Sequence, residues 1–331
     1  MPIRGRLAPS PTGALHLGNA RSFLLAWLAV RARGGAVVMR VEDLDGPRLK
    51  AGAEREALDD LRWLGLDWDE GPDVGGSFGP YRQTERLGLY RAALEQLVQR
   101  GLAYPCVCTR TEMERAASAP HAGEHETPYP GTCRGRFQSV AEAEQATGRP
   151  ASLRFRVEPE EVAFVDELAG PVRFTPAREC GDFVIEKVER SGPKAGLRTP
   201  AYQLACVVDD DAMAIDTVLR GDDLLASTAR QRLLQRALGL RQPATCHAPL
   251  LVGEDGRRLA KRHGDTTLRR FREAGVPPQR LVGWLALRSG LLDELTDASP
   301  RDLLDRFDLS RIPRGATVVR EAEIRALLGG R

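Results

Sequence analysis

The chain has 331 residues, 42% of them hydrophobic and 28% charged, a composition that excludes a disordered or fibrous protein. No apolar run approaches the ~20 residues of a membrane-spanning helix, and the first residues carry no secretory signal, so we expect a cytoplasmic protein of one or two domains. The net charge of +2 is uneven, because residues 241–331 hold 17 basic and 12 acidic side chains. This part is a candidate for nucleic-acid contact, although a solvated arginine-rich surface explains the charge equally well.

The chain begins with a strand, a turn and a helix. Residues 2–8 predict the strand, and residues 17–33 predict a helix that starts directly after the turn P-S-P-T-G-A-L-H. Such an arrangement presents backbone N–H groups to a phosphate. The turn matches neither the Walker loop nor G-x-G-x-x-G, and it places His16 at the mouth of the helix.

A second buried strand is predicted at residues 36–41, and it ends in acidic residues of which Glu42 is the first. Acidic side chains at the carboxyl end of a parallel strand lie where open α/β sheets bind ligands, and a capped turn is the alternative. Two helices are predicted next, at residues 51–64 and 84–100.

Three cysteines follow in a segment with turn residues around each. Cys106 and Cys108 form a C-x-C pair, and Cys133 follows later. Close thiols in a turn-rich segment of a cytosolic chain indicate a small structural zinc site. A fourth ligand is then needed, and the nearby candidates are Tyr129, His121 and His125. Three reduced cysteines in a connecting insert are the alternative.

The second half of the chain returns to alternating strands and helices. Alternation at residues 153–157 predicts a half-buried antiparallel strand, and residues 215–220 predict another strand. We expect Asp222 and Asp223 to cap the helix that follows. Residues 249–256 predict a strand with an Asp-Gly hairpin turn, and short helices separated by proline and glycine make up the rest.

Two distant motifs carry a resemblance to a known family. The stretch R-L-A-P-S-P-T-G-A-L-H-L-G-N at residues 6–19 and the stretch R-L-A-K-R at residues 258–262 resemble the HIGH and KMSKS elements of class I aminoacyl-tRNA synthetases. With V-E-D-L-D and V-L-R-G-D-D, they make the chain similar to the glutamyl/glutaminyl branch of that family.

The resemblance covers residues 4 to about 270 and implies an α/β fold with a Rossmann-like catalytic core. The core would comprise residues 1–104 and 151–240, with a zinc-binding insert at residues 105–150. A short, mostly helical C-terminal part would follow at residues 241–331.

The resemblance also implies ATP-dependent activation of L-glutamate to glutamyl-adenylate, with Mg²⁺ accompanying ATP. Only 69 residues follow Arg262, too few for the anticodon-binding region of a full glutamyl-tRNA synthetase. Branch members without that region transfer glutamate to queuosine in the anticodon loop of tRNA(Asp) and leave tRNA(Glu) uncharged. We expect this chain to have the same activity and to be a monomer. The alternatives are a truncated glutamyl- or glutaminyl-tRNA synthetase that charges a tRNA 3′ end, and a catalytically silent tRNA-binding relic.

Finally, the resemblance assigns site residues. The glutamate-binding residues would be Arg6, Ser10, Glu42, Tyr202 and Arg220. The ATP-binding residues would be His16, Gly18, Asn19 and Lys261, of which His16 and Lys261 would be catalytic. The zinc ligands would be Cys106, Cys108, Tyr129 and Cys133, and the other three cysteines would be plain buried thiols. Lys261 is one of only four lysines among 48 basic residues, and Ala260 stands where the family has serine.

Overall fold

The computed structural model describes residues 3–109, 111–113, 128–190, 195–257, 259 and 266–329. The strands are β1 (Arg4–Leu7), β2 (Ala36–Met39), β3 (Ala103–Cys106), β4 (Ser152–Phe155), β5 (Val162–Asp166), β6 (Gly170–Phe174), β7 (Val184–Val188), β8 (Arg198–Pro200), β9 (Thr217–Gly221), β10 (Ala244–Ala248), β11 (Leu251–Val252) and β12 (Thr317–Val318). The α-helices are α1 (Leu17–Arg31), α2 (Ala53–Trp63), α3 (Leu87–Gln99), α5 (Val140–Thr147), α6 (Pro176–Glu179), α7 (Tyr202–Ala212), α8 (Leu225–Leu238), α9 (Leu268–Glu273), α10 (Pro278–Arg288) and α11 (Glu321–Leu327).

A six-stranded sheet in the order β2-β1-β9-β10-β5-β6 forms the centre of the fold. The first five strands are parallel, and β6 pairs antiparallel with β5 as a hairpin at the sheet edge. Gly5 of β1 pairs with Thr217 of β9, so two segments from opposite halves of the core become neighbours. A Cβ at Gly5 would lie 2.2 Å from Val30, which explains why glycine occupies the place where α1 crosses the sheet.

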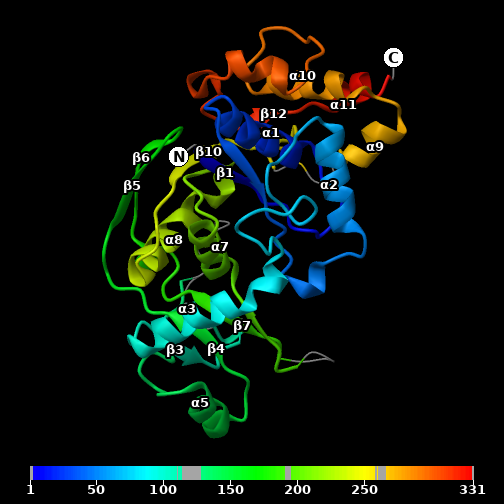
Figure 1. Ribbon diagram of the computed structural model, residues 1–331. Helices are drawn as coiled ribbons and strands as arrows, with labels where there is room; N and C mark the ends of the chain where they lie inside the picture. The colour runs from blue at the N-terminus through cyan, green and yellow to red at the C-terminus, as the bar shows by residue number, and fades with distance from the viewer. Residues whose placement is uncertain are drawn as a thin grey trace.

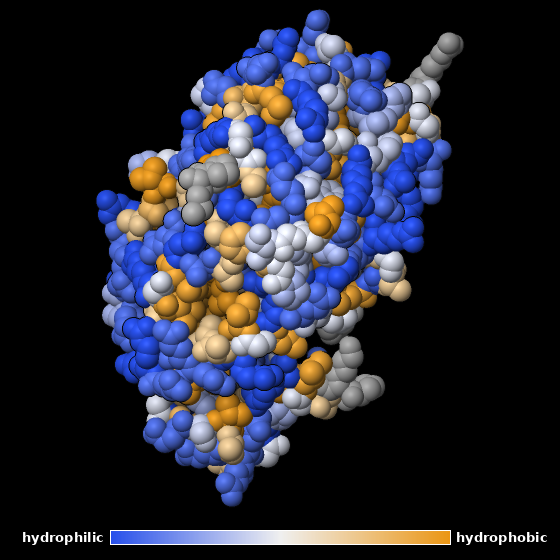
Figure 2. Space-filling view, viewed as in Figure 1, coloured by the Kyte–Doolittle hydropathy of each residue, from blue (hydrophilic) through white to orange (hydrophobic). Residues whose placement is uncertain are grey.

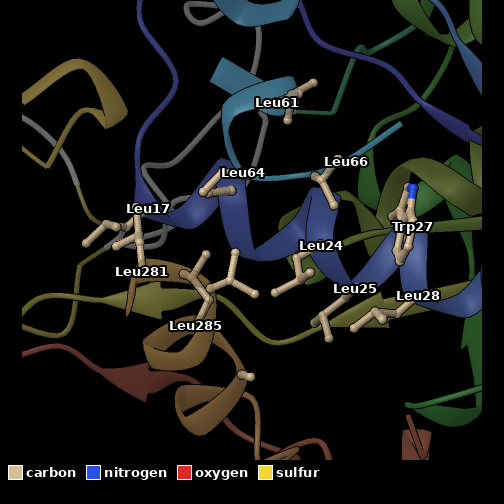
Figure 3. Packing of buried hydrophobic residues seen from close by; sticks show 14 of the residues in the cluster. Leu17, Leu24, Leu25, Trp27, Leu28, Leu61, Leu64, Leu66, Leu281 and Leu285 are labelled. Carbon is tan, nitrogen blue, oxygen red and sulfur yellow. The ribbon is translucent and has the colours of Figure 1, made fainter. Parts of the chain in front are cut away.

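The two faces of the sheet carry different helices. Val37 and Met39 point toward α1, whereas Val38 between them packs with Met213 on the other face, as the two-residue period of a strand requires. Helix α1 packs in turn against α10, and Figure 3 shows the leucines of α1 lying between those of the α2 region and those of α10. Helices α7 and α8 form the other layer with α3.

A second, antiparallel sheet in the order β3-β4-β7-β8 carries the cysteine segment. In Figure 1 this sheet and α5 lie at one end of the molecule, and the C-terminal helices α9, α10 and α11 lie at the other end, beside α1. The face drawn in Figure 2 is mostly hydrophilic, with apolar residues in small scattered groups. Among the described residues, no helix is both long enough and apolar enough to cross a membrane.

The predicted α/β class is confirmed, and two local expectations are wrong. The chain makes a 3₁₀ turn over Asp222–Leu224 before α8 begins. Gly221 is the N-cap of this turn and Leu224 is the N-cap of α8, so neither Asp222 nor Asp223 holds the cap position expected for it. The alternating strand β4 is not half-exposed, since Arg154 is only 5% exposed. Its guanidinium is drawn inward by partners in the cysteine segment, which are described below.

The hairpin turn predicted after the strand at residues 249–256 is confirmed. The Gly253 N–H donates to the Arg257 carbonyl at 2.8 Å, and the Leu259 N–H donates to the Leu251 carbonyl at 3.3 Å. The structure adds a partner that no local pattern indicated, because β11 also pairs in parallel with β12 near the end of the chain.

Candidate active site

A cavity of about 1120 Å³ opens at the carboxyl ends of β1 and β9, where open α/β sheets bind ligands. Its volume exceeds that of a pocket for one drug-sized molecule, so it has room for a nucleotide and a second small substrate. Its lining includes Arg6, Ser10, His16, Gly18, Asn19, Glu42, Lys50, Tyr202, Arg220 and Asp223. The structure thus brings together all the predicted glutamate-site and ATP-site residues except Lys261, which lies outside the described residues together with Ala260.

One wall of the cavity is the start of α1, where His16 is the N-cap. The His16 Nδ1 accepts a hydrogen bond from the Gly18 N–H at 3.1 Å, and the Asn19 side chain accepts one from the His16 N–H at 3.2 Å. Because Nδ1 accepts, a neutral His16 ring carries its proton on Nε2. A Cβ at Gly18 would lie 3.1 Å from the His16 ring, so glycine suits this close approach. The positive end of a helix at this wall favours an anionic ligand.

Arg6 reaches the cavity from β1 as part of a buried network of alternating charges. Its Nε donates to Asp210 Oδ1 at 3.1 Å, and Arg40 Nη1 donates to the same oxygen at 2.6 Å. Arg40 Nη2 donates to Glu42 Oε1 at 2.9 Å. The four formal charges cancel, and the network holds both Arg6 and Glu42 at the cavity wall.

The charges in this network stabilise one another against burial. Burial is the largest influence on Arg6 and lowers its pKa, but Asp210, Cys206 and Glu42 together outweigh it and raise that pKa above its ordinary value. Burial likewise favours protonation of Asp210, and the two neighbouring arginines outweigh it, so the pKa of Asp210 lies below its ordinary value. Cys206 contacts the same group, and burial and then Asp210 raise the pKa of its thiol to about 11. It is a buried neutral thiol, as expected.

Arg220 reaches the same cavity from β9, and its side-chain partners are uncharged. Its Nη1 donates to the Tyr202 hydroxyl at 3.0 Å, and its Nη2 donates to Thr228 Oγ1 and Gln231 Oε1, each at 2.8 Å. Its Nε donates to His247 Nε2 at 3.0 Å. In the part of the chain that the structure describes, no carboxylate forms an ion pair with Arg220. A buried guanidinium without a counter-ion favours an anionic ligand.

The three cysteines of the insert lie close to one another and are not part of the cavity lining. Their sulfur atoms all lie within 4.8 Å of one another, and Cys108 Sγ is 3.5 Å from Cys133 Sγ. The Tyr129 hydroxyl lies 3.3 Å from Cys106 Sγ and 3.6 Å from Cys108 Sγ. Sulfur atoms on a tetrahedral zinc ion are ~3.8 Å apart, so these four side chains fit a metal site. The alternative ligands His121 and His125 lie outside the described residues.

A buried arginine accompanies this cluster. Arg154 Nε donates to Cys106 Sγ at 3.2 Å, and its guanidinium lies 3.8 Å from the centre of the Tyr129 ring. Without a metal, burial raises the pKa of Cys108 to about 12, so that thiol is neutral at pH 7. A bound cation favours the thiolate form of each cysteine, and Arg154 is placed to balance the resulting negative charge.

Sequence reasoning missed the residues that hold the predicted site residues in place: Arg40, Asp210 and His247. Arg40 interrupts the apolar run A-V-V-M-R-V, and His247 lies within the buried strand β10. A charged or titratable residue inside a buried strand needs a partner, which is the signal that was present. The sequence does not say which partner, because Arg40 meets Asp210 of helix α7 and His247 meets Asp166 and Arg220 of other strands.

Comparison with known proteins agrees with this geometry. Residues 2–317 match the family described as tRNA synthetases class I (E and Q), catalytic domain. The chain belongs to this family. Among members of the class I family, the glutamyl-Q tRNA(Asp) synthetase of Symbiobacterium thermophilum is 51% identical over 327 residues, 98% of each chain. The glutamate–tRNA ligase 2 of Syntrophus aciditrophicus is 41% identical, and the match covers 97% of this chain but 64% of that one.

A solved structure of the same class supports the fold. The crystal structure of a glutamate tRNA ligase from Elizabethkingia meningosepticum in complex with its amino acid matches 99% of this chain and 69% of its own. The TM-score is 0.79 and the sequence identity is 25%. The fold of that synthetase is therefore shared over nearly the whole chain.

Proposed function

We propose that this protein activates L-glutamate with ATP and transfers it to queuosine in the anticodon loop of tRNA(Asp), as a glutamyl-Q tRNA(Asp) synthetase. The observation that carries the proposal is the 51% identity that spans 98% of both this chain and the relative of that name. The glutamate–tRNA ligase from Anaeromyxobacter is 43% identical, but the match covers only 61% of its length. The match thus spans nearly all of the glutamyl-Q relative but less than two thirds of this glutamate–tRNA ligase.

The cavity supplies what the first step needs. The glutamate α-carboxylate attacks the α-phosphorus of ATP, pyrophosphate leaves, and no proton has to be removed from the carboxylate. Catalysis then consists mainly of positioning and charge stabilisation. The glutamate carboxylates require cations, for which Arg6 and Arg220 are placed, and the ammonium group requires an anion, for which Glu42 is placed.

The ATP side of the cavity is assigned to the HIGH-like motif and to Lys261. His16, Gly18 and Asn19 form the helix start at which the phosphates would lie. Lys261 would supply a compact positive charge to the departing pyrophosphate. Mg²⁺ would accompany ATP and neutralise part of the phosphate charge.

The cysteine cluster is proposed to hold structural zinc. Its ligands would be Cys106, Cys108, Tyr129 and Cys133, whose donor atoms cluster as described above. A closed set of four protein ligands leaves no open coordination position, which is typical of a structural site rather than a catalytic one. Zinc would hold the short strands and turns of this insert together.

One labelling experiment tests the proposal. The protein is incubated with ATP, labelled glutamate and tRNA that contains queuosine, and the label is then mapped. We expect label on the queuosine of tRNA(Asp) and none on tRNA(Glu). Label on the terminal adenosine of tRNA(Glu) would instead establish a truncated synthetase. Absence of glutamate-dependent pyrophosphate exchange would indicate a silent relic. The enzyme is proposed to act in the cytoplasm. It is also proposed to be a monomer, and sedimentation equilibrium tests this oligomeric state.

A further inference from the structure

His247 is a buried histidine that lies between a carboxylate and the Arg220 guanidinium. Its side chain and that of Asp166 are both 0% exposed, and His247 Nδ1 lies 2.6 Å from Asp166 Oδ2. On the other side of the ring, Arg220 Nε donates to His247 Nε2 at 3.0 Å. The three groups therefore form a chain from the β5–β6 hairpin, through β10, to the cavity end of β9.

The protonation state of this imidazole follows from its partners. A guanidinium only donates hydrogen bonds, so Nε2 has to be the accepting nitrogen. The proton of a neutral ring is then on Nδ1, where it is donated to the Asp166 carboxylate. The tautomer that Arg220 requires is thus the tautomer that Asp166 selects.

Asp166 is itself held in one orientation. Its Oδ1 accepts the N–H groups of His247, Leu168 and Ala169 at 3.0 to 3.1 Å, which leaves Oδ2 directed at the imidazole. This carboxylate also lies where β5 pairs with β10, at the register pair Thr245 and Asp166. Backbone geometry where β5 meets β10 thereby fixes the position of the imidazole.

The hydrogen bonds from Asp166 through His247 reach Arg220 at the substrate cavity without neutralising its charge. A carboxylate in direct contact with Arg220 would satisfy its charge, as Asp210 does for Arg6. Here a neutral ring separates the carboxylate from the guanidinium, so Nε is held while the charge stays available toward the cavity. Arg220 lines the cavity together with Tyr202, whose hydroxyl accepts from Arg220 Nη1.

We propose that His247 and Asp166 are positioning residues for glutamate recognition: Asp166 sets the imidazole tautomer, and His247 orients Arg220 toward a carboxylate of the substrate. The inference rests on the proposed function, because it assumes that Arg220 binds glutamate. The pair acts on glutamate binding and leaves ATP binding unchanged.

Two substitutions of His247 separate the two contacts of the ring. A glutamine side chain places its amide oxygen near the position of Nε2 and so retains an acceptor for Arg220. An asparagine side chain places its amide group near Nδ1 and so retains only a donor for Asp166. Cys246→Ala is the matched control, since Cys246 is the neighbouring buried residue of β10 but packs into the α1 side of the core.

The experiment measures glutamate-dependent pyrophosphate exchange and thermal unfolding of the full chain. In His247→Asn we expect the KM for glutamate to rise by about ten- to hundredfold, with the KM for ATP unchanged. In His247→Gln we expect most of that rise to be reversed. Cys246→Ala should lower the unfolding temperature without changing either KM.

Other results would overturn the inference. A folded His247→Asn protein with the wild-type KM for glutamate contradicts it, and so does an equal rise in both KM values. If His247→Asn does not fold, Asp166→Asn takes its place, with the same selective rise expected. Failure of both variants to fold also contradicts the proposal, which assigns the pair to orienting Arg220 and not to folding.

The Arg220→Lys variant distinguishes this inference from the proposed function. If Arg220→Lys leaves the KM for glutamate unchanged, the assignment of Arg220 to glutamate is wrong. If Arg220→Lys raises that KM and the His247 variants do not, only the positioning role is wrong.

Discussion

Arg6 and Arg220 line one cavity from neighbouring strands, yet the chain surrounds them with opposite kinds of partner. Arg6 shares Asp210 with Arg40 in a group whose charges cancel. Arg220 is bonded to two hydroxyls, an amide, a carbonyl and an imidazole. The first arrangement is complete without a ligand, and the second leaves a buried positive charge that an anionic ligand would satisfy.

The difference separates a guanidinium that serves both the scaffold and the proposed ligand from one that serves chiefly the ligand. A buried ion pair stands on its own only when its desolvation is compensated by good geometry and further hydrogen bonds, and the Arg6 network meets both conditions. Uncharged partners orient a guanidinium but do not compensate its charge. We therefore expect Arg6 variants to affect folding and binding together, and variants around Arg220 to affect binding more than folding.

The largest expected effect is on the charged side of the cavity. Asp210→Ala leaves Arg6 and Arg40 buried without their shared counter-ion, so the free energy of unfolding should fall by about 3–5 kcal/mol. Denaturation with guanidinium chloride measures this free energy of unfolding. The neighbouring Asp211→Ala is the control, because Asp211 is partly exposed and pairs with Arg241 at the surface, where about 1 kcal/mol or less is at stake. Equal losses in the two variants would contradict the special role of Asp210.

A third buried arginine, Arg154, lies beside the cysteine cluster. Its counter-charge would be the thiolates that form when the metal binds. Three thiolates around one divalent cation leave a net negative charge beside Arg154. Arg154→Met should therefore weaken zinc binding by about ten- to hundredfold, measured by competition with a chelator. Arg156→Met is the control, since Arg156 is about half exposed and pairs with Glu158. Wild-type affinity in Arg154→Met would show that Arg154 does not stabilise the metal site.

A pH titration sharpens the uncharged side of the comparison. Burial first, and then Arg220, lower the pKa of His247 below its ordinary value, against the opposing effect of Asp166. Below about pH 6.5 the unfolded chain takes up a proton that the folded chain does not. The free energy of unfolding should therefore fall as the pH drops from 7 to 5.5, by at most about 1.4 kcal/mol per pH unit. Urea denaturation measures it, and His247→Asn should flatten the curve; an unchanged slope would contradict the neutral state of His247.

The smallest expected effect comes from a single hydroxyl. Thr228→Val removes the hydroxyl that accepts from Arg220 Nη2 and also lies 3.2 Å from His247 Nε2, while keeping the shape of the side chain. We expect the KM for glutamate to rise about fivefold with the KM for ATP unchanged, measured by pyrophosphate exchange. A rise as large as that of His247→Asn would mean that the neutral partners share the positioning equally.

Much of the fold was predictable from local pattern. The strand at residues 2–8, the helix at residues 17–33 and the strand at residues 36–41 follow from hydrophobic periodicity and turn residues, and they appear as β1, α1 and β2. The cap expected at Asp222 and Asp223 was wrong, because a 3₁₀ turn over these residues delays the start of α8 to Leu225. Cap positions depend on such small shifts and are the least predictable part of an element.

Apart from the resemblance, the candidate site was predictable only where its residues form short motifs. The motif around His16 and the C-x-C pair are short, so their residues are neighbours in the chain as well as in space. Arg154 was expected on an exposed face by strand alternation, and the structure buries it because its guanidinium meets Cys106 and Tyr129. No pattern within β4 carries that information.

By itself, the sequence determined the alternation of strands and helices and the residues at the mouth of α1, because periodicity and turn chemistry act over a few residues. Only the tertiary structure decided how the buried arginines are compensated. Arg6 meets an aspartate 204 residues away, and Arg220 meets His247 across two adjacent strands. The first pairing depends on where helix α7 packs on the sheet, and the second on the order of strands, which places β9 beside β10.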